Sequence, residues 1–243
     1  MNTSSLIEFE NAPIIEAIID ARMVFFEPPK ADALRAFAET LSGVDRVEDV
    51  FSVEAKIDIV EDSPPSLEKT FLGVRLFLDS GHCAAHVRPD GVSFSKLKPY
   101  DTWELLEVRF LELLELYRTA FGRARVHRLG VRYINQINLL DEDRPETVLN
   151  SWPRLLAGET QRSPHNFSQV FEFRGVQSSV GTRVIQIWDA DKKRFIFDLD
   201  TFQEFTEEEM DHGLFHEILD GLRQEKNKLF WGTIKDSVLR RFE

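Results

Sequence analysis

Short apolar runs separated by turn residues dominate the first hundred positions of the chain, a pattern typical of an antiparallel sheet. In residues 47–59 the apolar side chains alternate, and Val47, Phe51 and Val53 fall on one side, which predicts a half-buried strand. The segment Arg88-Pro89-Asp90-Gly91 predicts a tight reversal, because proline presets φ while aspartate and glycine tolerate a positive φ. Strands are therefore expected over residues 14–26, 47–59, 70–78, 83–87 and 92–97.

Two helices are expected in the same half. Pro28 and Pro29 end the first strand and open a helix that runs to about Leu41, since a missing N–H costs little in the first helical turn. A second helix is expected to open at Asp101, with Glu104 as its capping partner, and to end at Gly122. Its apolar positions form one broad stripe, so its glutamates are expected mostly on the opposite side, at positions 104, 107, 112 and 115.

The same order of elements recurs in the second half. Arg144-Pro145 opens a short helix that reaches about Leu155, and the pair Thr206 and Glu209 repeats the capping signal before a longer helix. A last amphipathic helix is expected over residues 229–242. Strands are expected over residues 125–140, 167–177, 183–189 and 195–202.

Both halves thus follow the order β–α–β–β(–β)–α, which predicts an α+β protein. So few helices cannot cover both faces of a sheet, so we expect a curved, mostly antiparallel sheet with the helices packed on one face. We interpret the chain as a single compact domain of two pseudo-repeats (about 12–122 and 123–228) plus a C-terminal helix (about 229–242), an internal duplication. Two such sheets side by side would form either a long saddle or a barrel-like cleft.

Composition narrows the class of protein. The formal net charge of −12 disfavours nonspecific binding to nucleic acid. The only cysteine, Cys83, excludes an internal disulfide framework and fits a reducing compartment. Residues 1–11 lack the basic and apolar regions of a secretory signal, and no stretch approaches the roughly 20 apolar residues that span a bilayer. We expect a cytoplasmic protein with no membrane partner, for which a homodimer is allowed.

The best candidate for a ligand site is the strand that begins the second half. The basic side chains of this strand, which include Arg128 and Arg132, allow two interpretations. They form an anion site, because a guanidinium group binds two oxygens of an anion through paired hydrogen bonds, or they form ion pairs with the abundant carboxylates of the chain. In residues 195–200, alternation puts Asp198 and Asp200 on one sheet face, where they would hold a divalent cation, act as an acid–base pair, or serve as partners of the arginines. The predicted ligand-binding residues are Arg128, Arg132, Tyr133, Asn135, Asp198 and Asp200.

Other chemical signals are weaker. His212 and His216 have a spacing that suits zinc, but Gly213 stands where a hydrolytic zinc helix carries glutamate. Nothing near Cys83 indicates a reactive thiolate, and we expect a buried structural thiol. Trp231 is expected in the core or, if exposed, on a surface that binds a protein. No catalytic residues, metal site or cofactor can be assigned from the sequence.

Four segments together resemble the marker segments of a sporadically distributed family of uncharacterised bacterial proteins. They are Asn11-Ala12-Pro13-Ile14-Ile15-Glu16-Ala17, Leu129-Gly130-Val131-Arg132-Tyr133-Ile134-Asn135, Phe197-Asp198-Leu199-Asp200 and Lys226-Asn227-Lys228-Leu229-Phe230-Trp231. The resemblance implies a bacterial source and no established activity, and the patchy distribution is associated with defence and toxin–antitoxin systems.

Three hypotheses follow. The first is a non-enzymatic binding protein that takes a protein partner or a small anionic ligand. The second is an accessory component of a defence or toxin–antitoxin system, such as an acidic neutraliser of a basic toxin. The alternative is a metal-dependent hydrolase or nuclease that uses the paired aspartates.

Overall fold

The computed structural model describes residues 9–56, 66–122, 124–151, 165–175, 179–205 and 213–243. In these residues every strand pair is antiparallel, and the strands form one nine-stranded sheet with the order β2-β3-β4-β5-β1-β6-β9-β8-β7. The predicted α+β class is thereby confirmed. The strands are β1 (Ile14–Val24), β2 (Val44–Lys56), β3 (Ser66–Leu78), β4 (Cys83–Arg88), β5 (Gly91–Leu97), β6 (Arg125–Asn138), β7 (Asn166–Arg174), β8 (Val180–Asp189) and β9 (Arg194–Glu204).

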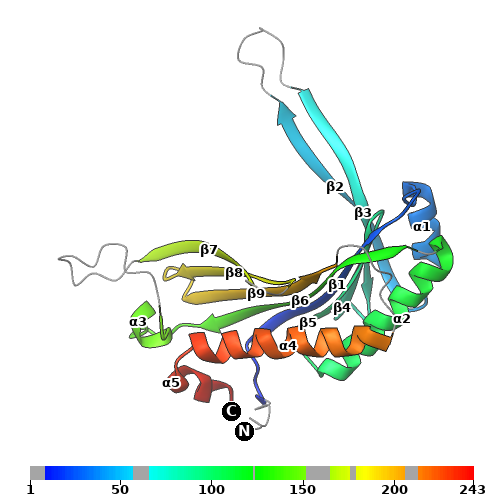
Figure 1. Cartoon of the computed structure of the whole chain (residues 1–243). Helices are drawn as coiled ribbons and strands as arrows, with labels where there is room; N and C mark the ends of the chain where they lie inside the picture. Colours follow the sequence, from blue (N-terminus) through cyan, green and yellow to red (C-terminus); the bar gives the residue numbers. More distant parts are fainter. Residues whose placement is uncertain (1–8, 57–65, 123, 152–164, 176–178, 206–212) are drawn as a thin grey trace.

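The long strands β1 and β6 pair at the middle of the sheet (Figure 1). The first half of the chain extends the sheet outward from β1, and the second half extends it outward from β6. Strands β2 and β7 are the two edges. The sheet is therefore open, and of the two expected shapes the closed barrel is excluded.

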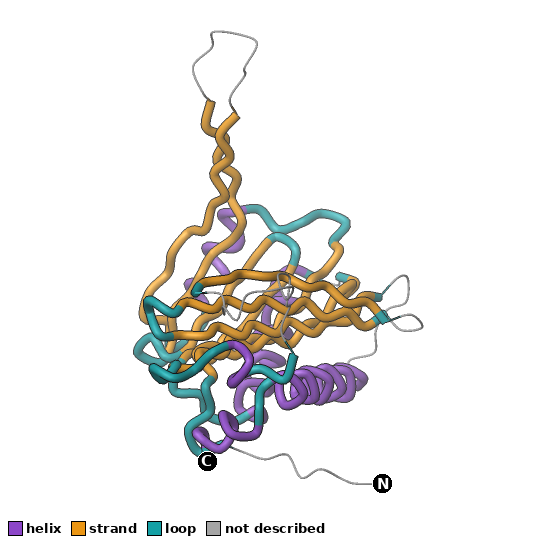
Figure 2. Tube along the Cα trace, turned by 90° about the vertical axis from the view of Figure 1, so that its left-hand side faces the viewer, coloured by secondary structure: helices purple, strands orange, loops and turns teal. Residues whose placement is uncertain are grey.

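Three helices pack on the sheet: α1 (Ala31–Thr40) against β3 and β4, α2 (Trp103–Phe121) against β5 and β1, and α4 (Gly213–Thr233) against β6 and β9. The helices α3 (Pro145–Val148) and α5 (Asp236–Leu239) are single turns, and a 3₁₀ turn, Arg240–Phe242, ends the chain. Figure 1 shows α4 running beneath the strands, and Figure 2 shows this long helix from the side.

The apolar core lies between the helices and the sheet. Strand alternation buries Ala17, Ile19 and Ala21 of β1, while their sequence neighbours face the other way. One cluster surrounds Tyr117 of α2, and a second contains Phe197 of β9. Each fully buried large side chain stabilises the fold by roughly 1.5–3 kcal/mol, so these two clusters hold α2 and α4 in place.

The expectation of a half-buried strand is wrong for residues 47–54, the part of the range 47–59 whose side chains the structure describes. The side chains of Val47, Val53 and, on the paired strand, Leu67 are 42%, 61% and 72% exposed. The hairpin of β2 and β3 extends beyond the helices (Figure 1), so its outer part has no layer to pack against. The alternation therefore predicted the strand correctly, but it did not predict that the side chains are exposed.

The boundaries of two helices differ from those expected. Thr102, not Asp101, is the N-cap of α2 and accepts a hydrogen bond from the backbone N–H of Leu105 at 3.3 Å. The Asp101 carboxylate instead pairs with Lys96 at 2.9 Å. Glu107 of α2 is buried rather than on the solvent side.

The separate helix expected over residues 229–242 is instead the end of α4 followed by α5 and the 3₁₀ turn. Helix α4 ends at Thr233, and the next residue, Ile234, pairs with Leu149 in an isolated bridge. Trp231 is partly buried and packs against the second core cluster.

Some sequence expectations lie outside the described residues. They are the capping pair Thr206 and Glu209, residues 57–59 and 176–177 of two expected strands, residues 152–155 of the short helix, His212, and the first eight residues. The expectation that the short helix continues through Leu149 is wrong, because α3 ends at Val148 and Leu149 has an extended backbone that pairs with Ile234. In the described part of the chain, no helix combines the length and the apolar character needed to cross a membrane.

Candidate functional site

Strand β6 sends its side chains alternately to the two faces of the sheet, and this divides the predicted site. Tyr133 and Asn135 lie on the face that α2 and α4 cover, with 3% and 3% exposure. Arg128 and Arg132 lie on the opposite face, which we call the charged face. Its members in the centre of the sheet are Asp20, Arg88, Arg128, Arg132, Asp198 and Asp200.

A chain of ion pairs runs across the charged face. Arg88 donates from Nη2 to Oδ2 of Asp20 at 2.5 Å, and Arg128 donates from Nη1 to Oδ1 of the same carboxylate at 3.2 Å. Arg128 also donates from Nη2 to Asp200 at 2.8 Å. These side chains come from β4, β1, β6 and β9, so the network links the two halves of the sheet across its centre.

Arg132 and Asp198 form a second pair with two parallel hydrogen bonds. Nε and Nη2 of Arg132 donate to the two carboxylate oxygens at 2.9 and 2.6 Å. These bonds raise the pKa of Arg132 above its ordinary value. Burial raises the pKa of Asp200 above its ordinary value, and the neighbouring Arg128 and Arg132 oppose that rise. The sequence left open whether the arginines pair with carboxylates, and here they do.

The aspartates Asp198 and Asp200 share a face, as alternation predicted, but each is engaged by its own arginine. No group of three His, Cys, Asp or Glu side chains in the described residues is placed to hold a metal ion. Nothing in this arrangement favours the hydrolase alternative over a binding role, and it stays a prediction.

More basic groups surround this network. Arg22 of β1 donates to Asp90 at 2.5 Å. His86 lies between β3 and β5 on the same face, and burial together with the positive charges of Arg88 and Arg75 lowers its pKa to about 4. His86 is therefore neutral at neutral pH, and the arginines carry the positive charge of the face.

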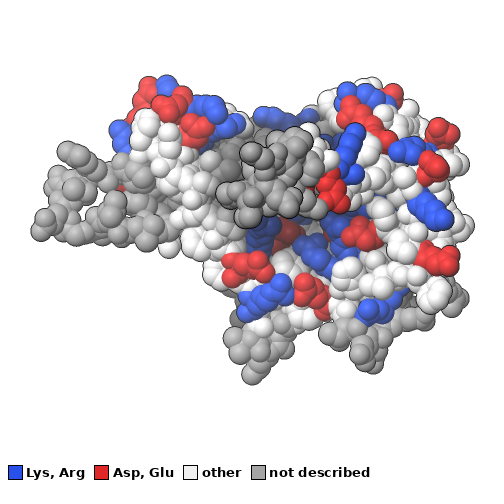
Figure 3. Space-filling view, turned by 90° about the horizontal axis from the view of Figure 1, so that it is seen from above, with Lys and Arg blue, Asp and Glu red and all other residues white. Residues whose placement is uncertain are grey.

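The charged face is hollowed. Figure 3 shows Lys and Arg side chains beside Asp and Glu side chains in a depression of the sheet. The depression holds about 520 Å³ and is lined from β1, β3, β4, β5, β6 and β9. Arg75 lines it and is exposed, and Arg183 of β8 lies opposite Asp200 and is exposed. The hollow thus offers cations to a ligand that approaches from solvent.

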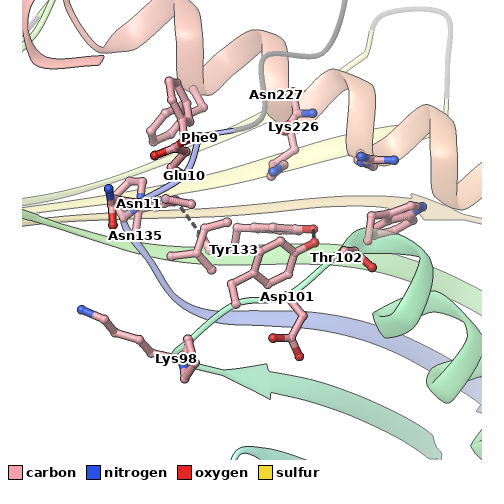
Figure 4. A pocket seen from close by; sticks show the side chains of 18 of the residues that line it. Phe9, Glu10, Asn11, Lys98, Asp101, Thr102, Tyr133, Asn135, Lys226 and Asn227 are labelled. Carbon is pink, nitrogen blue, oxygen red and sulfur yellow. Dashed lines mark hydrogen bonds between the residues drawn. The ribbon is translucent and has the colours of Figure 1, made fainter. Parts of the chain in front are cut away.

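On the opposite side of β6 lies a second cavity of about 370 Å³, which we call the lysine pocket and define by Tyr100, Trp103, Tyr133, Lys226 and Phe230. Figure 4 shows Lys226 extending from α4 toward Tyr133. The Nζ atom of Lys226 lies 3.4 Å from the centre of the Tyr133 ring. Burial, together with the positive charge of Arg223, lowers the pKa of Lys226 to about 7.

The two tyrosines of the lysine pocket form a hydrogen-bonded pair. Their hydroxyl oxygens lie 2.8 Å apart. Burial raises the pKa of both phenols, so both keep their protons at neutral pH. Asn135, at the edge of the pocket, donates from its side-chain amide to the carbonyl of Phe197 at 3.0 Å and is thereby fixed in orientation.

The weaker sequence candidates have structural roles. No second histidine among the described residues lies beside His216 to complete a zinc site. The Nδ1 atom of His216 lies 2.8 Å from the buried Glu107 carboxylate, and this contact raises the pKa of His216. Cys83 is buried, as expected, and burial raises the pKa of its thiol to about 11.

Sequence reasoning missed Asp20, Arg88, Tyr100 and Lys226. The signal for Lys226 was present in the helical spacing: Leu222, Lys226 and Phe230 are four residues apart, so the lysine occupies an apolar position of α4. Asp20 likewise falls inside an apolar strand. A charge at a position expected to be buried indicates a partner or a ligand.

Comparison of the chain with family models, with known proteins and with solved structures finds no match. The functional argument therefore rests on the geometry of the two faces of the sheet.

Proposed function

We propose that this chain is a non-enzymatic binding protein that uses the charged face to hold an anionic group of a small ligand or of a partner protein. The observation that carries the proposal is the gathering of guanidinium groups in the hollow of an acidic chain. Guanidinium groups bind carboxylate and phosphate oxygens through paired hydrogen bonds. Asp20 already orients Arg88 and Arg128, so their positive charges hold fixed positions when a ligand binds the more exposed arginines.

Arg75, Arg132 and Arg183 are the groups within reach of a ligand. The side chain of Arg132 is 41% exposed although it is bonded to Asp198. Arg75 and Arg183 are exposed, and no ion pair with another described residue involves either of them. The nearby carboxylates repel an anion, so binding is expected to be modest in affinity and to weaken with salt.

Calorimetry at low ionic strength tests the proposal with two probes, pyrophosphate for a small anion and a hexaglutamate peptide for an acidic partner segment. The double variant R75Q/R183Q removes the two exposed arginines of the charged face. The control R46Q/R240Q removes the same charge from exposed arginines elsewhere.

At least one probe is expected to bind the wild-type protein and to bind R75Q/R183Q about tenfold more weakly, with the control within about twofold. Equal binding by the two double variants, or no binding of either probe to the wild-type protein, would contradict the proposal.

Two finer features belong to the same proposal. We infer that the two halves arose by duplication and that their helices share one face, which the strand order supports: β5, β4 and β3 follow outward from β1, and β9, β8 and β7 follow outward from β6. The single cysteine supports a cytoplasmic location. The family resemblance supports a role as an accessory protein in bacterial defence. Genes for a toxin or a defence effector beside this gene would be the expected neighbours.

A further inference from the structure

The lysine pocket contains a buried cation without a described counterion. Lys226 is 7% exposed, and no described carboxylate forms an ion pair with it. Isolated ammonium groups are costly to bury, so buried lysines are almost always paired. The contact with the Tyr133 ring offsets part of this cost, because the face of an aromatic ring attracts a cation. The ring supplies no negative charge, however, and the ammonium keeps hydrogen-bonding capacity that a ligand can fill.

Two further donors of the same pocket are also unfilled. The indole N–H of Trp103 is buried and has no hydrogen-bond partner among the described residues. In the pair of Tyr100 and Tyr133 one hydroxyl donates to the other, so one of the two phenolic protons has no described acceptor. A cavity whose buried polar groups are donors is complementary to an anion.

The rest of the wall is aromatic. Phe9, Phe230 and Trp231 line the cavity together with the tyrosines and Trp103. The volume of about 370 Å³ falls within the range of small-molecule sites. Flat apolar walls of this kind accept an aromatic ring, which stacks or packs edge-on against the side chains.

We propose that the lysine pocket binds a small aromatic carboxylate, with its carboxylate paired to Lys226 and its ring among the aromatic side chains of the wall. Lys226 is mostly buried, so the pair is stronger there than on the surface. This site is separate from the charged face, because β6 lies between them and sends Tyr133 and Arg132 to opposite sides.

Binding is expected to depend on pH. Burial lowers the pKa of Lys226 to about 7, so the free protein loses the ammonium proton above that pH, and a bound carboxylate restores it. The affinity should therefore fall about tenfold for each pH unit above 7. The other charged or titratable groups that line the pocket are Arg223 on α4, Tyr133 on β6, Glu10 before β1, and Lys98, Tyr100 and Asp101 between β5 and α2.

Titration calorimetry with phenylacetate and benzoate at pH 6 tests the proposal, and phenylacetamide serves as the neutral analogue. Lys226→Met removes the charge and keeps the apolar stem. Lys228→Met is the matched control, since Lys228 lies two residues further along α4 with a side chain that is 70% exposed. Thermal unfolding of both variants confirms that they are folded.

At least one carboxylate is expected to bind the wild-type protein and K228M alike, to bind K226M at least tenfold more weakly, and to bind more tightly than phenylacetamide. R75Q/R183Q should bind it as the wild-type protein does, which separates this site from the charged face. The proposal is overturned if neither carboxylate binds at millimolar concentration, if K226M binds as well as K228M, or if the amide binds equally well.

Discussion

The pair of Arg132 and Asp198 makes an asymmetric prediction about stability. The side chain of Asp198 is 8% exposed, whereas that of Arg132 is 41% exposed. Removing the arginine leaves a nearly buried carboxylate without its two charge-assisted hydrogen bonds. Removing the aspartate leaves a guanidinium that can turn into solvent. The two variants should therefore differ, although they break the same contact.

The magnitude follows from what each variant leaves behind. Breaking a buried pair by removing one partner costs roughly 3–5 kcal/mol, and the open side of the charged face reduces this to about 3 kcal/mol for Arg132→Gln. Asp198→Asn retains one acceptor and leaves an exposed cation, so about 1 kcal/mol is expected. For a chain of this length, 1 kcal/mol shifts Tm by roughly 2–4 °C.

Urea and thermal unfolding at pH 7 measure these differences, with Arg240→Gln as the exposed control that should change stability by no more than about 0.5 kcal/mol. The double variant R132Q/D198N should be less destabilised than R132Q alone by about 1–2 kcal/mol, because it removes the unpaired carboxylate. If D198N costs as much as R132Q, burial does not control the energetics of this pair and the reasoning fails.

Three further predictions concern other parts of the molecule. Lys226→Met should stabilise the fold by a few kcal/mol below pH 7, because the folded protein holds the Lys226 ammonium proton less tightly than the unfolded chain does. The gain in stability should vanish as the pH rises toward 10.5, and urea unfolding at several pH values measures it. Gly91→Ala should destabilise the fold by about 2–4 kcal/mol, because φ is +140° and a Cβ there would lie 2.0 Å from the carbonyl oxygen of Ala21. Gly43→Ala should cost only about 1 kcal/mol, because the space around Gly43 is open. Equal losses of Tm in the two variants would refute this prediction. His216→Gln should remove at most about 1 kcal/mol at pH 6 and nothing at pH 9, because the raised pKa of this exposed histidine gives a contribution that is lost as the pH rises through the folded value; a pH-independent loss in chemical unfolding would contradict it.

Local patterns were sufficient to predict most of the elements. The reversal at Arg88-Pro89-Asp90-Gly91 was expected from its turn residues; it joins β4 to β5, and Gly91 adopts a positive φ. The two central strands were expected because alternation and β-branched residues act within a single segment. The expected cap of α2 was wrong by one residue because Thr102 and Asp101 both suit an N-cap, and the local sequence does not show that Asp101 pairs with Lys96.

The candidate site was less predictable because it depends on pairings between distant segments. The sequence placed Arg128, Arg132, Tyr133 and Asn135 in one site because they are neighbours in the chain. Period-two alternation separates them, and the partners that complete each face come from residues about 70 to 110 positions away in the sequence, as the bond from Arg128 to Asp20 illustrates. The alternation that was applied to Asp198 and Asp200 would also have assigned the β6 side chains to the correct faces of the sheet.

The two faces of β6 differ in how their charges are satisfied, and that difference bears on what each can bind. On the charged face, the central arginines already have carboxylate partners, so a ligand must replace bonds such as that between Arg132 and Asp198 or use the exposed rim. The net gain is small, as in most exchanges of one ion pair for another, and it is screened by salt. In the lysine pocket, the ammonium and the Trp103 N–H have no described partner, so a ligand removes an existing penalty instead of competing with a bond. We therefore expect weak and salt-sensitive binding at the charged face, and tighter binding with little dependence on salt in the lysine pocket. Calorimetry at 50 and 500 mM salt tests this contrast. An equal proportional loss of affinity at both sites would contradict it.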